Sequence, residues 1–253
     1  MQDNGSPTLT PAAAAGADEP EACPHCGKPP ALCVCAMVDV IDNRVAVLIL
    51  QHPQEQDRLL GTAKLAVRQL ANSEFRIGLS WPSLAKALGR AADPSEWAVL
   101  HLGAARGVEL PAGREVVVLD RKGAVIADQD AALRGLKGIV VFDGTWAQAK
   151  TLWWRNAWVL KARRLVLDPK RRSLYGELRR EPRRESLSTI EAVGLALGAI
   201  ERKPEIDSTL RAGFQAMLDK YRAGVANGKV VPDTPRAAGE RKRDWRRRPT
   251  KRT

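Results

Sequence analysis

The sequence predicts an α/β protein with a mostly parallel sheet and helices on both faces. The class is predicted by short apolar runs that alternate with segments of helical periodicity. The hydrophobic fraction, 44% of the 253 residues, is high enough for a real core and excludes wholesale disorder. A chain of this length and apolar content can form one domain of ordinary size with tails.

The expected elements follow one another in regular order along the chain. Strands are expected at residues 45–50, 75–79, 97–102, 116–119, 139–142 and 165–167. Helices are expected over residues 59–70, near 83–88, near Ala131 and from Trp146 onward. Two helices with apolar stripes, from Ile190 to Ile200 and from Ile206 to Tyr221, close the body.

Composition divides the chain into four parts. Residues 1–21 are rich in Ala, Pro and Gly and are expected to be a disordered leader, followed by a cysteine cluster at 22–37. The body spans residues 38–228, and residues 229–253 form a basic tail that is expected to be disordered. Neither a secretory signal nor an apolar run of about 18 residues is visible, so we expect no membrane association and a cytoplasmic location.

The formal net charge of +12 is concentrated in two blocks. Residues 161–184 contain ten Lys or Arg and three acids, and residues 236–253 contain nine and two. The remainder is slightly acidic. Such blocks predict a polyanionic partner, RNA or DNA, although an Arg-rich tail can also serve only to keep a protein in solution.

All four cysteines, Cys23, Cys26, Cys33 and Cys35, lie in one short segment. Two close pairs separated by a Gly/Pro-rich turn can direct four thiolates at one tetrahedral zinc ion, as a zinc knuckle does. Such a closed site leaves no position for water, so its role would be structural. The alternatives are free or redox-active thiols, or a site in which His25 replaces one sulfur.

A second pattern lies where the strand at 139–142 meets the next helix. Residues 143–146 read Asp-Gly-Thr-Trp and lie at the carboxyl edge of a parallel sheet, where ligands bind and helix amides favour anions. Residues 145–148 also match a capping box, as do residues 188–191. Simple helix caps, and turn chemistry at Asp143, are therefore the local alternatives.

Several motifs occur together in one order: the Cys pairs, His-Pro-Gln-Glu at 52–55, Thr62, the motif at 143–146, and Leu-Ser-Thr-Ile-Glu-Ala at 187–192. Together they resemble the DTW-domain family over residues 23–202. The resemblance implies a tRNA-uridine aminocarboxypropyltransferase that is similar to SPOUT proteins, with a C-terminal trefoil knot around S-adenosylmethionine. The residue pattern alone predicts an unknotted, doubly wound sheet, because knots are rare.

The resemblance also implies site residues. Asp143 is expected to act as general base at uridine N3, with Thr145 and Trp146 beside it. The donor pocket is expected to comprise Leu102, Gly103, Phe142, Asp143, Gly144, Thr145, Leu187, Ser188 and Thr189. Glu55 is expected to hold the ammonium group or a ribose of the donor, and an ordinary surface ion pair is the alternative.

A basic stretch that leads into Ser188 is well placed to bind tRNA phosphates beside the reacting base. The expected substrate contacts are His52, Glu55, Thr62, Arg163, Arg164, Lys170, Arg171, Arg172, Arg179, Arg180, Arg183 and Arg184. 

Four tryptophans crowd the helix that begins at Trp146. Trp146 and Trp153 are expected to share a buried face, whereas Trp154 or Trp158 is a candidate for stacking on an unpaired base. His101, at a strand end, is expected to be structural.

Two other functions remain open from the sequence. One is an RNA methyltransferase of the SPOUT type, and the other is a non-catalytic, zinc-containing RNA-binding protein. Whether the protein is a monomer or a homodimer is also open.

Overall fold

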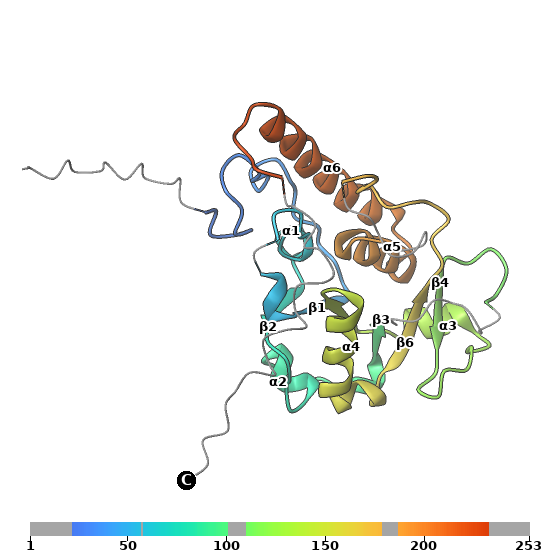
Figure 1. Cartoon of the computed structure of the whole chain (residues 1–253). Coiled ribbons are helices and arrows are strands. Elements are labelled where there is room, and N and C mark those ends of the chain that lie inside the picture. The colour runs from blue at the N-terminus through green and yellow to red at the C-terminus, as the bar shows by residue number, and fades with distance from the viewer. Residues whose placement is uncertain (1–21, 57, 101–109, 179–186, 233–253) are drawn as a thin grey trace, which may run out of the picture.

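The computed structural model describes residues 22–56, 58–100, 110–178 and 187–232. Within these residues, six strands form one sheet in the order β2-β1-β5-β3-β6-β4 (Figure 1). They are β1 (Ala46–Gln51), β2 (Ser73–Ile77), β3 (Trp97–Leu100), β4 (Val116–Leu119), β5 (Gly138–Asp143) and β6 (Arg163–Leu167). Neighbouring strands pair in parallel, except that β4 runs antiparallel to β6. The predicted mostly parallel α/β sheet is confirmed.

Each expected helix is present and in the expected order. The helices are α1 (Ala63–Arg68), α2 (Leu84–Leu88), α3 (Gln129–Arg134), α4 (Trp146–Arg155), α5 (Thr189–Glu201) and α6 (Pro204–Ala226). Three short 3-10 helices, which the sequence did not predict, are η1 (Pro53–Glu55), η2 (Pro94–Glu96) and η3 (Ala157–Lys161). Helix α1 begins later than expected because a turn between Arg58 and Gly61 precedes it. None of the helices in the described ranges has the length and apolar character that a bilayer-crossing segment needs.

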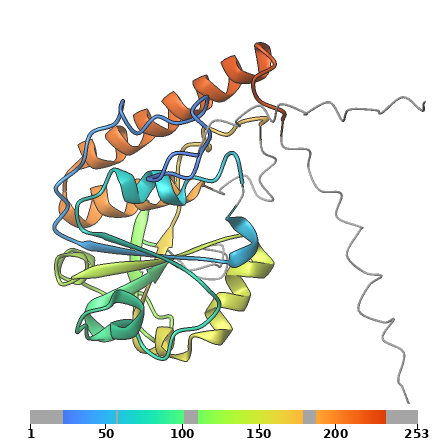
Figure 2. The same ribbon diagram turned by 90° about the vertical axis from the view of Figure 1, so that its left-hand side faces the viewer.

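The sheet is covered on both faces, as the periodicity predicts. Strand β1 is buried throughout, and its side chains alternate between two cores. Val47 and Ile49 pack in the core beneath α1, α3, α5 and α6, whereas Leu48 and Leu50 pack in the core beneath α2, α4 and η3. Figure 2 shows α5 and α6 on one side of the sheet and α2 and α4 on the other.

The cysteine segment packs against the body. Leu32 and Val34 are buried in the same core as α5 and α6. Lys28 Nζ donates a hydrogen bond to the Leu59 carbonyl oxygen, and Lys220 Nζ, from α6, donates one to the Cys33 carbonyl oxygen, each over 2.5 Å. Core contacts and hydrogen bonds therefore tie residues 22–37 to α6 and to the segment before α1.

Candidate active site

Asp143 ends β5 near the middle of the sheet, and two neighbours hold its carboxylate. Oδ2 accepts a hydrogen bond from Gln51 Nε2 at 2.8 Å, and Oδ1 accepts one from Thr189 Oγ1 at 2.5 Å. Gln51 is the register partner of Asp143 at the end of β1, and Thr189 opens α5. Three segments that lie far apart in the sequence therefore meet at one carboxylate.

The turn between β5 and α4 requires glycine. Gly144 has a φ of +155°, and an added Cβ would lie 3.0 Å from the Gln148 Cβ and 3.4 Å from the His52 Cβ. The backbone N–H of His52 also donates to the Asp143 carbonyl oxygen at 3.0 Å. A side chain here would be strained by the positive φ and would have to displace Gln148 and His52, and the close contact with the segment after β1 holds Asp143 beside η1.

Both predicted capping boxes are formed, so the helix-cap interpretation is confirmed at both positions. Thr145 Oγ1 accepts from the Gln148 N–H, and Gln148 Oε1 accepts from the Thr145 N–H at 2.6 Å. Ser188 and Glu191 make the same reciprocal pair at the start of α5. The two hydroxyls thus orient the helices, and an anion at this edge would meet the backbone amides that open α4.

Two buried oxygen atoms at this edge lack a hydrogen-bond partner among the described residues. They are Gln51 Oε1, at the end of β1, and Glu55 Oε1, in η1. Glu55 is only 5% exposed, and its other oxygen lies 3.4 Å from Arg58 Nε. Buried polar atoms usually have partners, so these two oxygens are candidate acceptors for a polar ligand. The ion pair expected as the alternative for Glu55 exists, with the Glu55 carboxylate buried and the Arg58 side chain partly exposed.

Thr62 and Glu191 stabilise the entry into α5. Thr62 is buried, and its Oγ1 accepts a hydrogen bond from the Ile190 N–H at 3.3 Å. Glu191 is fully buried; it accepts from Ser188, from the Ser173 hydroxyl and from Arg211 Nη1 at 2.6 Å. The sequence identified Glu191 only as a cap, and it carried no signal for the non-local Arg211 pair.

Loss of the Glu191 charge should destabilise the protein strongly. In Glu191→Gln, the Arg211 guanidinium loses its carboxylate partner in a largely buried position, and breaking a buried pair costs about 3–5 kcal/mol. Urea unfolding followed by circular dichroism measures this change. The exposed Glu177→Gln serves as control and should change the free energy of unfolding by less than about 0.5 kcal/mol. Equal stability of the two variants would contradict the role of the pair.

The four cysteine sulfurs form a compact group whose ligand atoms all lie within 4.8 Å of one another. Cys23 Sγ and Cys35 Sγ are 3.9 Å apart, close to the separation of about 3.8 Å that four Zn–S bonds of 2.3 Å give at a tetrahedral ion. Gly27, at φ +68°, makes the turn that returns the chain. His25 is exposed and lies outside the group, so the alternative with a histidine ligand is not supported.

The thiol environments also fit a metal cation. Hydrogen bonds from the backbone amides of Cys26 and His25 lower the pKa of Cys23 to about 6. Burial raises the pKa of Cys26 and of Cys35. The two buried thiols therefore keep their protons in the absence of a cation and must release them when a metal binds.

The basic residues in β6 and after it differ in their surroundings. Lys170 and Arg172 are exposed, whereas Arg171 forms an ion pair with Asp207. Arg163 and Arg164 begin β6, so about four residues of strand, roughly 13 Å, separate Arg163 from the carboxyl edge. The structure therefore does not bring these last two residues to the edge where Asp143 lies.

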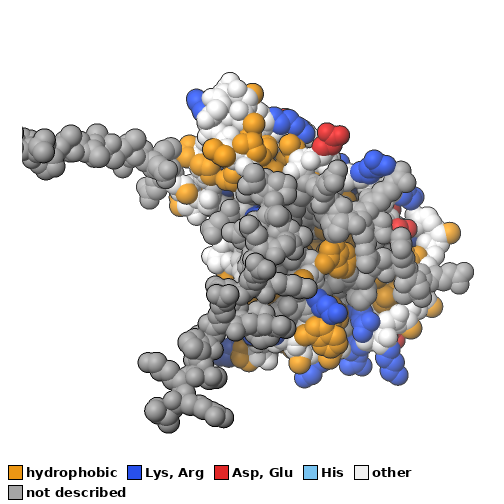
Figure 3. All heavy atoms as spheres, in the orientation of Figure 1, with side chains coloured by type: hydrophobic (Ala, Val, Ile, Leu, Met, Phe, Trp, Pro, Cys, Tyr) orange, Lys and Arg blue, Asp and Glu red, His pale blue; other side chains and the backbone are white. Residues whose placement is uncertain are grey.

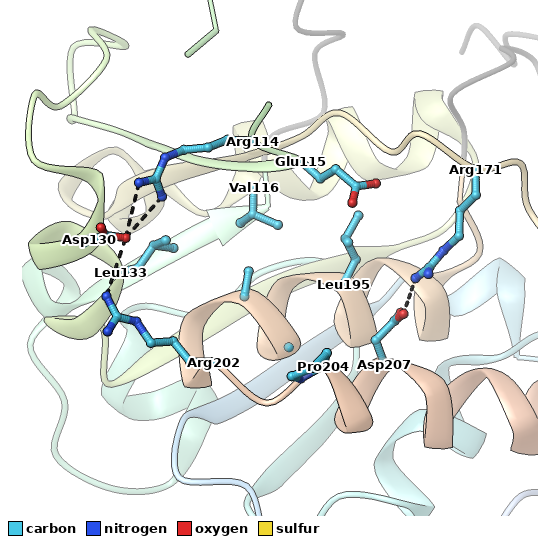
Figure 4. A pocket seen from close by; sticks show the side chains of 12 residues that line it. Arg114, Glu115, Val116, Asp130, Leu133, Arg171, Leu195, Arg202, Pro204 and Asp207 are labelled. Carbon is cyan, nitrogen blue, oxygen red and sulfur yellow. Dashed lines mark hydrogen bonds and ion pairs between the residues drawn. The ribbon is translucent and has the colours of Figure 1, made fainter. Parts of the chain in front are cut away.

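A pocket of about 390 Å³ lies away from the Asp143 motif, between the start of β4 and helices α3, α5 and α6 (Figure 4). Arg114 and Arg202 both contact Asp130, and Arg171 contacts Asp207. Hydrogen bonds and charge from Arg114 lower the pKa of Asp130. Each of these three arginines has an acidic partner, so the pocket presents no excess of positive charge.

Some expected site residues lie outside the described residues. They are His101, Leu102, Gly103, Arg179, Arg180, Arg183 and Arg184. Phe142 and Leu187 lie among the described residues. Phe142 precedes Asp143 in β5, and Leu187 precedes Ser188, the cap of α5.

The tryptophans differ from expectation in part. Trp146 is 40% exposed, so the prediction that it is buried is wrong: α4 buries Ala149 and Leu152 instead. Trp153 is half-buried against Phe142. Trp158 is buried and donates its indole N–H to the Trp81 carbonyl oxygen, which excludes it from stacking on RNA.

Comparison with known proteins finds one family and several relatives. The DTW domain matches residues 20–222. The Macaca fascicularis protein named tRNA-uridine aminocarboxypropyltransferase 2 is 25% identical, over 77% of this chain and 61% of that protein. The Mus musculus protein of the same name is 26% identical, over 83% of this chain and 72% of that protein. The Arabidopsis thaliana protein tRNA-uridine aminocarboxypropyltransferase A is 28% identical, over 71% and 72%. No solved structure matches the chain significantly. The domain match covers most of the sequence, and the chain therefore belongs to the DTW domain family.

Proposed function

We propose that this protein transfers the 3-amino-3-carboxypropyl group of S-adenosylmethionine to N3 of a tRNA uridine and releases 5′-methylthioadenosine. The observation that carries this proposal is the pair of hydrogen bonds through which Gln51 and Thr189 hold the Asp143 carboxylate. The bond from Thr189 joins the motif at residues 187–192 to the motif at residues 143–146. The names of the relatives supply the reaction.

The edge offers suitable groups for the amino-acid end of the donor. The amides that open α4 favour the donor carboxylate, and the unpartnered Glu55 Oε1 favours its ammonium group. Holding both groups would turn the γ-carbon, rather than the methyl group, toward uridine. The sulfonium of the donor supplies the leaving group.

Asp143 is the proposed general base. Its carboxylate accepts the N3 proton while N3 forms a bond to the γ-carbon, and the broken carbon–sulfur bond leaves its electron pair on sulfur. Hydrogen bonds from Gln51 and Thr189 fix the orientation of the carboxylate for this transfer. Thr145 acts by capping α4 and so aligns its amides.

The proposal also includes a structural zinc ion held by the four cysteines, a cytoplasmic location, and the knotted arrangement of SPOUT proteins. The zinc site is supported by the four sulfur atoms, which all lie within 4.8 Å of one another. Reduced thiols are expected in the cytoplasm. The knotted arrangement rests on the resemblance to the DTW-domain family alone.

Nucleoside mass spectrometry of tRNA that has been incubated with the protein and S-adenosylmethionine tests the proposal. A uridine heavier by about 101 Da is expected, whereas methyl transfer through the other carbon would add about 14 Da. A product of 14 Da, or no product together with tight tRNA binding, would overturn the proposed reaction.

The exposed basic residues after β6 are expected to contact tRNA phosphates. The double variant Lys170→Glu and Arg172→Glu should weaken tRNA binding about tenfold and reduce its salt dependence, because each lost phosphate contact lowers the salt slope by about one. Filter binding at several salt concentrations measures both effects. The control is the double variant Arg121→Glu and Lys122→Glu, which changes the net charge by the same amount and lies beyond the carboxyl end of β4, next to the amino end of β6. Equal losses in both variants would indicate only a general charge effect.

A further inference from the structure

The outer face of α4 carries a row of exposed side chains that begins at the candidate active site. Trp146 is 40% exposed and Trp154 is 70% exposed, and Lys150 lies between them in an exposed position. Residues four apart are neighbours on a helix surface, so these three side chains form one stripe about 12 Å long. Stacked nucleotides rise by about 3.4 Å each, so this length matches three to four nucleotides.

Trp154 differs from the two tryptophans near it in sequence. Trp153 packs edge-to-face on Phe142 with 6.2 Å between ring centroids, and the Arg164 guanidinium lies 5.9 Å above its ring. Trp158 is buried in the core beneath α4. The core therefore accounts for Trp153 and Trp158, whereas it leaves most of the Trp154 indole in contact with solvent.

Every charged side chain between Trp146 and Lys161 is positive. Residues 146–161 include Lys150, Arg155 and Lys161, all exposed, and no acidic residue. Figure 3 shows hydrophobic side chains beside Lys and Arg over α4. Aromatic rings next to cations are the combination that binds unpaired nucleotides, through stacking on bases and attraction of phosphates.

We infer that the Trp146–Lys150–Trp154 stripe of α4 binds the unpaired tRNA nucleotides next to the target uridine, with Trp154 stacking on one base and Lys150 contacting a phosphate. This inference rests on the proposed function, because the Asp143 edge places the target uridine at the start of the stripe. The stripe continues directly from residues 143–146, so a nucleotide strand that leaves the active site along α4 meets Lys150 and then Trp154.

Three substitutions of Trp154 separate stacking from hydrophobic contact. Trp154→Ala removes the side chain, Trp154→Leu keeps an apolar side chain without a ring, and Trp154→Phe keeps a ring. In direct binding assays with unmodified tRNA and no donor, the Ala and Leu variants should bind about tenfold more weakly than the wild type, and the Phe variant less than about threefold. Lys150→Gln should lower the salt slope of binding by about one.

Steady-state kinetics and chromatography complete the test. The KM for tRNA should rise in Trp154→Ala, while kcat at saturating tRNA and the affinity for S-adenosylmethionine stay unchanged. Wild-type tRNA affinity in Trp154→Ala would overturn the inference, as would equal affinities of the Leu and Phe variants. So would a shift from dimer to monomer at unchanged tRNA affinity, which would assign the stripe to contact between two copies.

The binding assay contains no donor, so it decides this inference independently of the reaction. If the wild-type protein forms no aminocarboxypropyl product but Trp154→Ala still loses tRNA affinity, the proposed function fails and the nucleotide-binding surface stands.

Discussion

Asp143→Asn is expected to lower kcat about 1,000-fold while leaving the affinity for S-adenosylmethionine nearly unchanged, because the variant loses a general base and little else. Asparagine keeps the shape of the side chain and can still accept from Thr189 Oγ1 at one oxygen. Rotation of the Gln51 amide would bring its unpartnered Oε1 toward the new amide group and restore the second hydrogen bond.

A matched control lies at the same edge of the sheet. Asp168 follows β6 and is exposed, so Asp168→Asn should retain wild-type kcat. Single-turnover assays with saturating tRNA and donor measure the chemical step, and isothermal calorimetry measures donor affinity. Near-normal turnover of Asp143→Asn would reject Asp143 as the base, and lost donor affinity would reassign it to donor binding.

Removal of the metal is expected to have the second large effect. Cys26→Ser should lose the zinc ion and lower the free energy of unfolding by at least about 4 kcal/mol, or Tm by about 10 °C, because structural zinc contributes directly to folding. The effect should extend beyond residues 22–37, because Leu32 and Val34 lie in the main core and Lys220 of α6 binds the Cys33 carbonyl oxygen.

The matched control is His25→Ala, which changes an exposed residue outside the sulfur group and should keep full zinc content and Tm. Metal content is measured by mass spectrometry of the purified protein, and stability by calorimetry. Titration of the wild type with a chelator gives a second measurement if Cys26→Ser does not fold. The zinc site would be rejected if the purified wild type contained no metal, if its four thiols titrated freely, and if the chelator left its Tm unchanged.

Local chemistry made much of this fold predictable. Strand β4 has the bounds that its apolar run predicts, and both capping boxes open helices where the sequence places them. Strand order was not predictable, because the pairing of β1 with β5 depends on residues about 90 positions apart, such as Gln51 and Asp143. The same reason hid Gln51 as a partner of Asp143.

Helical periodicity gave a wrong prediction for the burial of Trp146. It placed Trp146 on a buried face with Trp153, yet Trp146 lies in the first turn of α4, and the core contacts come from Ala149 and Leu152. Periodicity shows which side chains share a face, but the position of the helix end relative to the sheet decides whether that face is covered.

The place of β1 between β2 and β5 has a consequence during synthesis. Residue 143 leaves the ribosome 92 positions after Gln51, a delay of about 5–20 s at typical rates of elongation. During this interval β2 can pair with one edge of β1, while the other edge of a wholly apolar strand, apart from its terminal Gln51, has no partner. An exposed strand edge of this kind readily pairs with other chains, so the nascent protein is expected to depend on chaperones until β5 emerges and takes the place between β1 and β3.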